Sequence, residues 1–391
     1  MAAERIFVTG MGAVTPYGAS VDRLWQGLLV AEPGISAIDR FDLGGIACVK
    51  GGQIRHYAPP APPHPLPRLD LATGFALGAC TEALAQAGGD ATETGLVTAS
   101  NFGALDEGEC ALAGEAPETA LEACAQALPT RRLAAALGLD GPAVTLSLSC
   151  AASAAALAHA AALLRAGRAR RLLVAGYDAL SRCAWSGLCS LRTMTRDCVR
   201  PFDLDRSGTL FSEGACALVL EREDVCAARG GEPLAELSGW ATGNNGFHMT
   251  APPPRAAGSA QVMRAAIACA GLTPGDVDHI NAHGTGTRPN DLTEAQAIQD
   301  LFGPRAASLP VTANKGAIGH LLGAAGGIEA IVSILSQRHG LIPPTANFAT
   351  PDPEARVDLV VARPREASLR HVLSNSAGFG GCNAALLFTK V

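Results

Sequence analysis

Residues 144–156 read VTLSLSCAASAAA, and residues 311–323 read VTANKGAIGHLLG. Each stretch starts with β-branched residues, which favour a strand, and passes through a polar turn into small residues that favour a closely packed helix. The same plan at two distant places indicates that one strand–turn–helix unit occurs twice. A chance likeness between apolar strands is the alternative, so a duplication needs further pairs.

Three further pairs follow in the same order: 6–14 with 234–239, 96–103 (LVTASNFG) with 279–286 (HINAHGTG), and 214–220 (GACALVL) with 382–388 (CNAALLF). Four ordered pairs favour duplication over chance. The remaining expected elements are a helix over 70–88 and strands over 95–99, 143–148 and 171–175. Strands alternating with helices are typical of an α/β protein. We therefore predict two duplicated βαβ-type halves, residues 1–228 and 229–391.

The composition excludes several classes of protein. Hydrophobic residues make up 48% of the 391 residues and charged residues 17%, which allows a large core and argues against disorder. With a net charge of −6 and no basic run, a nucleic-acid partner is not expected. The longest weakly polar run, 151–164, is shorter than the roughly 20 residues of a membrane span. With no secretory signal apparent, we expect a cytoplasmic protein with no membrane association, whose proline-dense segment 57–67 forms a surface loop.

Two tempting motifs are set aside. None of the twelve cysteines forms a C-x-x-C pair, so we expect reduced thiols and no metal site. Gly10 and Gly12 begin a G-x-G, but Thr15 stands where a dinucleotide-binding loop needs its third glycine. We interpret these two glycines as a tight turn.

Cys150 differs from the other cysteines in its surroundings. It lies between a β-branched strand and a helix of small residues, so the helix N-terminus is expected to favour its thiolate. Small neighbours leave room for a substrate to approach. By position alone, a buried packing cysteine is the commoner outcome, and the choice depends on partners.

Two histidines are candidate partners. His283 follows an expected strand, and His320 is expected early in the helix that duplicates the Cys150 helix. In a duplicated fold the equivalent strand ends meet, which would bring Cys150, His283 and His320 to one pocket. Lys315 precedes His320 by five residues, and Glu329 is expected nine residues after His320 on the same helix. They form either a solvated ion pair or a pair that sets the protonation of the histidines.

The chain resembles the elongating β-ketoacyl-acyl carrier protein synthases of the thiolase superfamily. The matching motifs span nearly the whole sequence: VTGMG at 8–12, Cys150 in its small-residue setting, PFD at 201–203, EGA at 213–215, HMTAP at 248–252, HGTGT at 283–287, KGAIGH at 315–320 and GFGG at 378–381. A Cys-His-His set separates this family from initiating synthases and from degradative thiolases. The resemblance implies a thiolase-like α/β fold with α-β-α-β-α layers.

The resemblance also implies a mechanism. Cys150 would accept an acyl group from the phosphopantetheine of an acyl carrier protein, and His283 and His320 would stabilise the enolate that forms when a malonyl thioester loses carbon dioxide. The other implied roles are catalytic support by Lys315, support of the histidines' protonation by Glu329, an oxyanion hole of the Cys150 and Phe379 N–H groups at the gate, and pantetheine binding by Thr285, Thr287 and Gly380. No metal or redox cofactor is implied, because phosphopantetheine comes with the substrate. The expected product is a 3-oxoacyl-acyl carrier protein.

Departures from the family pattern concern the acyl pocket and its gate. The segment 101–133 is short and acidic and is expected to be a loop that faces away from the carrier. Ala377 stands where the family usually has phenylalanine, Cys382 where it has threonine, and Phe211-Ser212 where it has leucine and glycine. These departures favour a specialised type II fatty acid or polyketide pathway, such as one that makes a polyene. The arginines expected to hold the carrier are Arg192, Arg196, Arg200 and Arg206.

Two other functions stay open at this stage. One is a non-catalytic subunit like the chain-length factors, although these typically lack the active cysteine. The other is an acyl-binding or thiolytic relative. We expect a dimer, formed either with a second copy or with a related synthase-like subunit.

Overall fold

The computed structural model describes residues 4–65, 69–253 and 257–391. Its main feature is a twelve-stranded sheet in the order β13-β11-β10-β15-β16-β9-β1-β8-β7-β5-β6, with β2 (Gly18–Ala19) beside β1. The bounds of the sheet strands are β1 Ile6–Thr15, β5 Gly95–Ala99, β6 Ala143–Leu146, β7 Arg171–Asp178, β8 Gly214–Arg222, β9 Ala235–Asn244, β10 His279–Asn281, β11 Pro310–Thr312, β13 Asp358–Leu359, β15 His371–Ala377 and β16 Cys382–Thr389. Two short ribbons, β3 (Ser36–Ala37) with β4 (Lys50–Gly51) and β12 (Leu341–Ile342) with β14 (Arg365–Glu366), lie apart from it.

The strand pairing is the same in both parts of the sheet. In the order β6-β5-β7-β8-β1 the first two pairs are parallel and the last two antiparallel, and the order β11-β10-β15-β16-β9 has the same sequence of pairings. The two sets join where β1 pairs with β9 at Phe7 and Val8. The predicted α/β fold with two duplicated halves is confirmed. The boundary between residues 228 and 229 stays a prediction.

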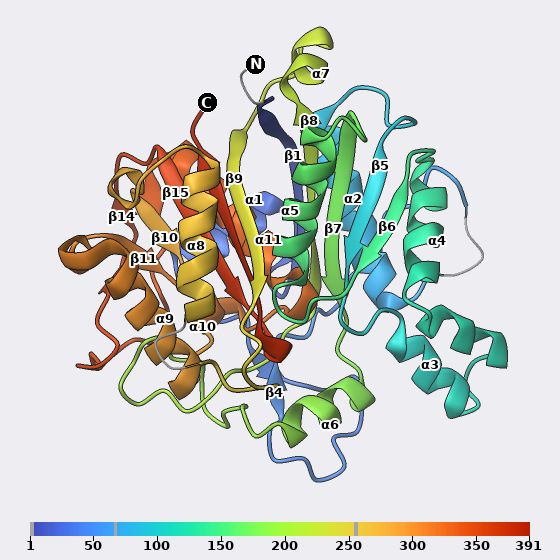
Figure 1. Cartoon of the computed structure of the whole chain (residues 1–391). Coiled ribbons are helices and arrows are strands. Elements are labelled where there is room, and N and C mark those ends of the chain that lie inside the picture. The colour runs from blue at the N-terminus through green and yellow to red at the C-terminus, as the bar shows by residue number, and fades with distance from the viewer. Residues whose placement is uncertain (1–3, 66–68, 254–256) are drawn as a thin grey trace.

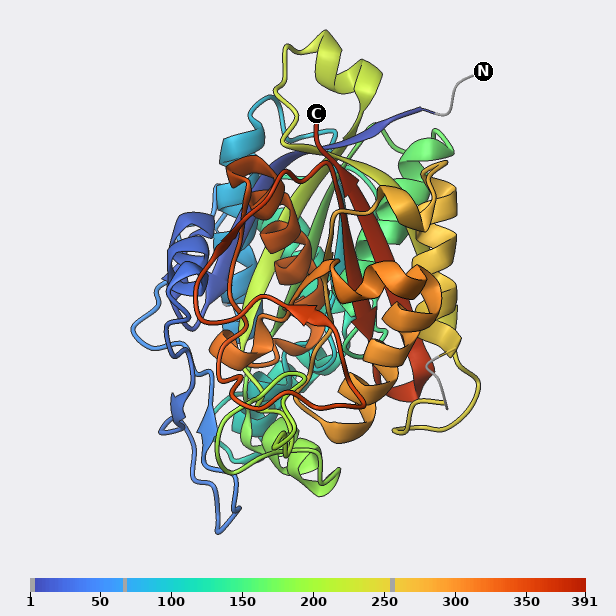
Figure 2. The ribbon, with the colours of Figure 1, turned by 90° about the vertical axis from the view of Figure 1, so that its left-hand side faces the viewer.

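Helices lie on both sides of the sheet and between its two parts (Figures 1 and 2). The central α5 and α11 pack on each other, while α2 and α4 cover one outer face and α8 and α9 the other. The helices are α1 Val21–Leu29, α2 Leu71–Ala87, α3 Leu105–Leu112, α4 Ala127–Leu137, α5 Ala152–Arg165, α6 Arg182–Ser190, α7 Glu223–Ala228, α8 Ala257–Cys269, α9 Arg288–Phe302, α10 Lys315–Ile318 and α11 Ala325–His339. No helix in the described ranges is long and apolar enough to cross a bilayer.

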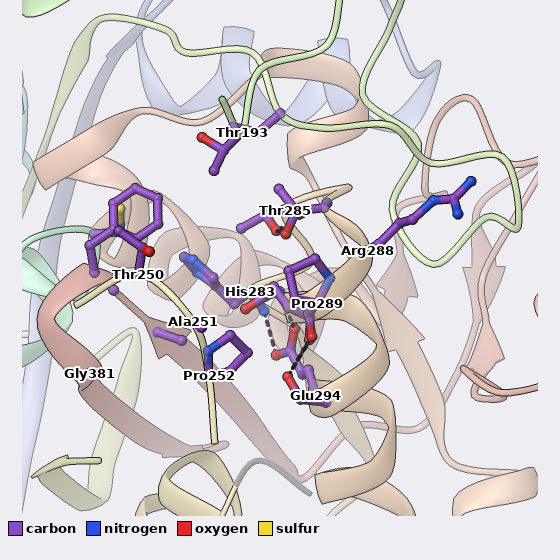
Figure 3. Close-up of a pocket in the computed structure, with 18 of the residues that line it drawn as sticks. Thr193, Thr250, Ala251, Pro252, His283, Thr285, Arg288, Pro289, Glu294 and Gly381 are labelled. Atoms are coloured by element: carbon purple, nitrogen blue, oxygen red, sulfur yellow. Dashed lines mark hydrogen bonds between the residues drawn. The ribbon is translucent and has the colours of Figure 1, made fainter. Parts of the chain in front are cut away.

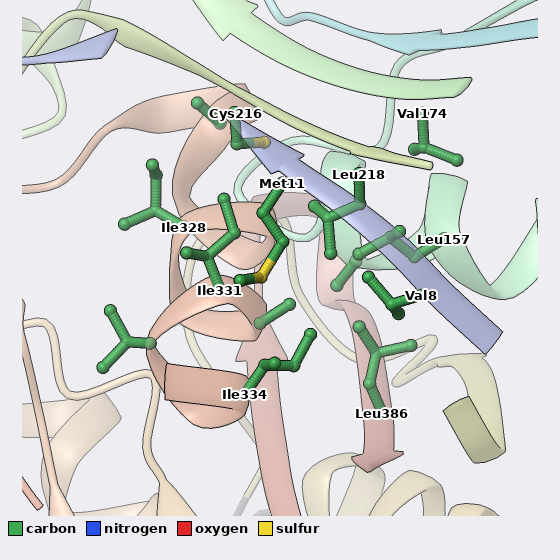
Figure 4. Packing of buried hydrophobic residues seen from close by; sticks show 14 of the residues in the cluster. Val8, Met11, Leu157, Val174, Cys216, Leu218, Ile328, Ile331, Ile334 and Leu386 are labelled. Carbon is green, nitrogen blue, oxygen red and sulfur yellow. The ribbon is translucent and has the colours of Figure 1, made fainter. Parts of the chain in front are cut away.

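The core lies between the sheet and the two central helices. Figure 4 shows Met11 of β1 and Leu218 of β8 packed with Leu157 of α5 and Ile331 of α11. All four side chains are buried, and burying side chains of this size contributes about 1.5–3 kcal/mol each. Small residues let the central helices approach closely, because a Cβ on Gly326 of α11 would lie 2.7 Å from the Cβ of Ala154 in α5.

Gly10 and Gly12 serve a different purpose from the tight turn that we predicted. Both lie inside β1, and an added Cβ would lie 2.0 Å from the carbonyl oxygen of Ala83 at Gly10 and 1.9 Å from that of Ala79 at Gly12. The interpretation as a turn was therefore wrong. The glycines allow α2 to pack directly against the strand.

The local predictions succeeded where capping signals were clear. Helix α2 begins after Asp70, whose side chain accepts the Thr73 N–H at 2.8 Å, and ends at Gly88, whose φ is +64°. The segment 101–133 was wrongly predicted to be a loop, because it contains α3, a 3₁₀ helix over Glu118–Cys124 and the start of α4. The proline-dense segment lacks regular structure over 57–65, and its last two residues lie outside the described ranges.

Candidate active site

Cys150 lies where β6 passes into α5. The preceding residue, Ser149, has a φ of +51°, an uncommon value for a residue with a side chain. This sharp turn places Cys150 two residues before the first residue of α5. The side chain is 7% exposed. Strained turns of this kind often present a reacting group, so this geometry favours the nucleophile over a simple packing cysteine.

The thiol of Cys150 does not have the low pKa that we expected from the helix N-terminus. Burial raises the pKa of the thiol to about 11, although the charge of Lys315 and hydrogen bonds from Ser149 and the Phe379 N–H act in the opposite direction. Desolvation outweighs the favourable dipoles. The thiol is therefore protonated at rest, and its proton must leave during acyl transfer.

His283 follows β10 and is held by a buried carboxylate and a buried ammonium. The Glu294 carboxylate accepts the backbone N–H groups of His283 at 2.8 Å and of Gly284 at 2.9 Å. Lys315 Nζ lies 3.2 Å from His283 Nδ1 and donates to the His283 carbonyl at 2.5 Å. Because an ammonium can only donate, Nδ1 is the acceptor and the imidazole proton is on Nε2.

His320 reaches the same protonation state by a different contact. The Leu322 N–H donates to His320 Nδ1 at 3.1 Å, which leaves the proton on Nε2. Nε2 is buried and has no hydrogen-bond partner among the described residues. The two imidazole rings lie edge to face with their centroids 5.4 Å apart. Burial and the charge of Lys315 hold the pKa of both histidines well below 6.5, so both are neutral N–H donors.

The prediction of one helix that carries both His320 and Glu329 was wrong. His320 lies between α10 and α11 rather than within a helix, and Lys315 and Glu329 lie on these two different helices. Each of the two charged side chains is almost fully buried, and Lys315 Nζ donates to Glu329 Oε1. Burial raises the pKa of Glu329 to about 7 against the opposing effect of Lys315. The pair is a buried support for His283 and not a solvated surface pair.

Sequence reasoning missed two buried carboxylates. Glu294 also accepts the Asn375 side-chain N–H at 2.7 Å, and so joins α9 to β15 behind His283. Asp178, at the end of β7, accepts the Ser100 hydroxyl at 2.7 Å and the Gly323 N–H at 2.7 Å. The signal for Glu294 was an acidic residue in the helix that follows HGTGT, and for Asp178 a carboxylate at a strand end.

The glycine-rich loop at 378–381 packs directly on the nucleophile. A Cβ on Gly378 would lie 3.0 Å from the Cys150 backbone nitrogen, and the Phe379 N–H donates to the Cys150 sulfur. Gly380 donates its N–H to the Met249 carbonyl at 2.6 Å, and its own carbonyl accepts the Asn244 side chain at 2.8 Å. Each of its polar groups thus has a partner within the protein, and its role in pantetheine binding stays a prediction.

Two cavities meet at Cys150. The first, here called the histidine pocket, measures about 430 Å³ and is lined by Cys150, His283, His320, Thr285 and Thr287 among others (Figure 3). The Thr285 and Thr287 hydroxyls lie 2.8 Å apart. The second, here called the apolar pocket, measures about 530 Å³ and is lined by Cys150 and, among others, by Phe102, Leu105, Leu188, Leu191 and Leu322. Phe211 and Phe379 line both pockets.

One of the four arginines that were expected to hold the carrier is buried. Arg206 is buried and pairs with Asp352 at 2.5 Å, so it holds the fold and does not face a partner. Arg192 and Arg196 are exposed, and Arg192 lines the histidine pocket. Arg200 pairs with Asp197 at 2.7 Å.

The acidic segment at 101–133 is only partly a surface. Glu107 is buried, and Glu109 accepts the Ser181 hydroxyl at 2.7 Å at the start of α6. Burial raises the pKa of Asp106 to about 6. The exposed acidic residues are Glu115, Glu118 and Glu122.

Family models match most of the chain, and known proteins match nearly all of it. The N-terminal domain of beta-ketoacyl synthases matches residues 3–225, and their C-terminal domain matches 234–349. A 3-oxoacyl-[acyl-carrier-protein] synthase 2 from Synechocystis sp. is 33% identical over 99% of this chain and 98% of its own length.

Solved structures give the same result. The ishigamide ketosynthase/chain length factor matches with a TM-score of 0.92 and 32% identity over 100% of both chains. AntDE:AntF, a type II PKS acyl-carrier protein in complex with its ketosynthase bound to the hexaketide, matches with a TM-score of 0.89 and 27% identity, again over 100% of both chains. With its duplicated fold and its full-length matches, the chain belongs to the β-ketoacyl synthase family.

Proposed function

We propose that the protein condenses an acyl thioester with a malonyl thioester on an acyl carrier protein and forms a 3-oxoacyl-carrier product. The observation that carries this proposal is the meeting of Cys150 with two neutral Nε2–H donors in one pocket. Donors directed at a developing oxyanion are often the largest contribution to catalysis of acyl chemistry. The phosphopantetheine comes with the substrate, and the proposed steps use only the chain's own side chains.

The first step is acyl transfer to Cys150. The sulfur attacks the thioester carbonyl, the bond to the carrier sulfur breaks, and the thiol proton passes to the departing carrier thiolate. The N–H groups of Cys150 and Phe379 stabilise the tetrahedral oxyanion. Because burial raises the pKa of the thiol, attack and proton transfer are coupled in this step. The acyl chain extends into the apolar pocket.

The second step forms the carbon–carbon bond. A malonyl thioester enters the histidine pocket with its arm against Thr285 and Thr287, and its carbonyl oxygen accepts the Nε2–H groups of His283 and His320. The bond to the carboxylate breaks, carbon dioxide leaves, and the electron pair forms an enolate. This carbanion attacks the acyl carbonyl, and the Cys150 thiolate that leaves takes a proton from water. Lys315 and Glu329 hold His283 in the donor tautomer.

The carrier and the working assembly are part of the same proposal. The exposed Arg192 lies at the histidine pocket, where a cation suits the phosphate of the arm and the acidic surface of a carrier. The protein of this proposal works as a dimer, with a second copy or with a related synthase-like subunit, in a type II fatty acid or polyketide pathway. The match to the ishigamide ketosynthase/chain length factor supports this second arrangement.

Intact-mass analysis tests the proposal. After incubation with an acyl-carrier protein, the wild-type chain is expected to gain one acyl mass, and Cys150→Ala none. Cys183→Ala is the matched control, because Cys183 lines the apolar pocket without the strand-to-helix turn, and this variant is expected to load normally. A wild-type chain that never acylates would instead be a non-catalytic partner subunit.

Decarboxylation separates the two half-reactions. Cys150→Ala should still release carbon dioxide from malonyl-carrier protein, because the histidines are intact. His320→Ala should retain at least part of the acyl loading, while decarboxylation falls about 10²–10³-fold, the usual value of one oxyanion donor. Loading without any carbon dioxide or condensed product in the wild type would indicate a thiolytic or acyl-binding protein.

A further inference from the structure

Two hydroxyl groups in the histidine pocket have no role in the steps above. Thr193 and Thr209 both line this pocket. The Oγ1 atom of each is buried and has no hydrogen-bond partner within the described residues, the same condition as His320 Nε2. A buried polar group without a partner destabilises a fold, so such groups at a functional pocket indicate that a ligand supplies the partner.

Thr209 lies on a segment that is tied to His320. The His320 N–H donates to the Leu210 carbonyl at 2.8 Å, and the Ser212 N–H donates to the His320 carbonyl at 2.8 Å. Phe211, two residues after Thr209 and therefore on the same face of this extended segment, has its ring 5.5 Å from the His320 ring. Thr209 thus belongs to the histidine end of the pocket.

Thr193 lies beside Thr209 on the neighbouring segment. The Thr209 N–H donates to the Thr193 carbonyl at 2.9 Å, and the Thr195 N–H donates to the Thr209 carbonyl at 3.0 Å. Figure 3 shows Thr193 across the pocket from Gly381 and Glu294, with His283 and Thr285 between them. Thr193 therefore lies on the side of the pocket opposite Gly381 and Glu294, and Thr209, its hydrogen-bonded neighbour, lines the same pocket.

The substrate has one group that needs these donors. If the proposed function holds, His283 and His320 bind the thioester oxygen, and the carboxylate of the extender unit is only one methylene away from that carbonyl carbon. A carboxylate accepts hydrogen bonds and offers none, which suits two hydroxyl donors. Lys315, the cation behind His283, is occupied by Glu329 and the His283 carbonyl.

Neutral donors also suit the chemistry of this group. The carboxylate is charged in the bound substrate and leaves as neutral carbon dioxide, so a contact that stabilises its charge is stronger in the ground state than in the transition state. A fully charged partner would therefore oppose decarboxylation, because only contacts that strengthen towards the transition state accelerate a step. Two hydroxyls give orientation and selectivity with less of this opposing effect.

We propose that Thr193 and Thr209 are specificity-determining residues that bind the carboxylate of the malonyl unit through their hydroxyl groups. They select a dicarboxylic extender over a simple acyl thioester in the histidine pocket. This inference rests on the proposed function and assigns the extender carboxylate to a named wall of the site.

The test compares two small thioesters that differ only in the carboxylate. Thr193→Val and Thr209→Val remove the hydroxyls with little change of shape, and both are made in the Cys150→Ala background. KM for decarboxylation is measured with malonyl-pantetheine, and acetyl-pantetheine serves as a competitive inhibitor. Each variant is expected to raise KM for malonyl-pantetheine about tenfold, the effect of one hydrogen bond to a charged group, with the inhibition constant of acetyl-pantetheine unchanged.

The control is Thr195→Val. The Thr195 hydroxyl lies 2.7 Å from that of Ser207, and Thr195 does not line the pocket. It is expected to leave KM unchanged. The melting temperature gives a second readout, because removing an unpaired buried hydroxyl should leave the stability equal or higher, whereas a structural role predicts a clear loss.

The possible outcomes separate this inference from the proposed function. Equal weakening of malonyl- and acetyl-pantetheine would mean that the hydroxyls bind the shared arm, and no change for either would mean that they bind no substrate group. Either result overturns the inference while leaving the proposed function intact. A wild-type chain that neither decarboxylates nor condenses malonyl substrates would instead refute the proposed function.

Discussion

The buried pair of Lys315 and Glu329 offers the sharpest quantitative test of the site. Both side chains are almost completely buried, and Lys315 also donates to the His283 carbonyl. Replacing Lys315 by Met keeps the volume and removes the charge. Glu329 would then be a buried carboxylate without its cation, and such a group loses its charge where it can.

The expected loss of stability follows from the protonation of Glu329. In the wild type, burial already raises the pKa of Glu329 to about 7, even though Lys315 lowers it. Without Lys315, the carboxyl stays protonated in the folded state at pH 7, whereas in the unfolded chain it ionises near pH 4.3. At about 1.4 kcal/mol for each pH unit, keeping this carboxyl protonated costs about 4 kcal/mol at pH 7 relative to the unfolded chain, and the wild type already carries most of this cost because its own pKa is about 7.

The sign of the pH dependence is the strict part of this prediction. An acid whose folded pKa is raised contributes a penalty that is absent below its unfolded pKa and grows as the pH rises. Relative to a variant that lacks the Glu329 carboxyl, the free energy of unfolding of Lys315→Met should therefore fall by about 3 kcal/mol between pH 5 and pH 7. Urea unfolding at both pH values measures this difference.

A double-mutant cycle provides the control. Glu329→Gln in the Lys315→Met background removes the titrating group, so the double variant should regain stability at pH 7 and lose its pH dependence. Decarboxylation should stay low in both variants, because His283 has lost the ammonium that fixes its tautomer. A difference between Lys315→Met and the double variant that is equal at pH 5 and pH 7, or no recovery in the double variant, would refute this account of the pair.

Three further perturbations have definite expected outcomes. Burial lowers the pKa of His279 to about 3, so as the pH falls the unfolded chain gains a proton at this residue before the folded chain does. The free energy of unfolding should therefore fall by about 2 kcal/mol between pH 6.5 and pH 5. In urea unfolding, His279→Leu should remove this part of the loss, and the control His64→Gln, at an exposed position, should not. Arg192→Glu should raise KM for carrier-bound substrates in a salt-sensitive manner and leave pantetheine thioesters unaffected, whereas Arg206→Ala should lower the melting temperature and affect both substrates alike. Asp178→Asn should slow decarboxylation while the KM for carrier-bound substrates stays unchanged, because an amide cannot accept all the hydrogen bonds that are now donated to the carboxylate. An unchanged rate would show that this carboxylate has no effect on the turn that carries His320.

Local sequence signals predicted the elements that have strong boundaries of their own. The strand over 95–99 was predicted to the residue, and the helix over 70–88 is α2 together with its two caps. The segment 101–133 was missed because its helices are short and are stabilised by contacts elsewhere. Glu109, for example, accepts hydrogen bonds at the start of α6, which is distant in sequence.

The sequence by itself determined the duplicated fold and the identity of Cys150, His283 and His320 as a set. The repeated strand–turn–helix pattern implies equivalent strand ends, and these ends bring the three residues to one pocket. These properties follow from the local periodicity of the sequence and from the order of its segments. Both can be read from the sequence without any knowledge of the contacts between segments.

Only the tertiary structure decided the protonation of these residues. The raised thiol pKa, the neutral Nε2–H imidazoles and the buried Lys315–Glu329 pair all arise from burial and from partners on other elements. The unpaired hydroxyls of Thr193 and Thr209 are likewise visible only when every neighbour is placed. The physical reason is that desolvation and hydrogen bonding depend on distances between residues far apart in sequence, and folding alone brings those residues together.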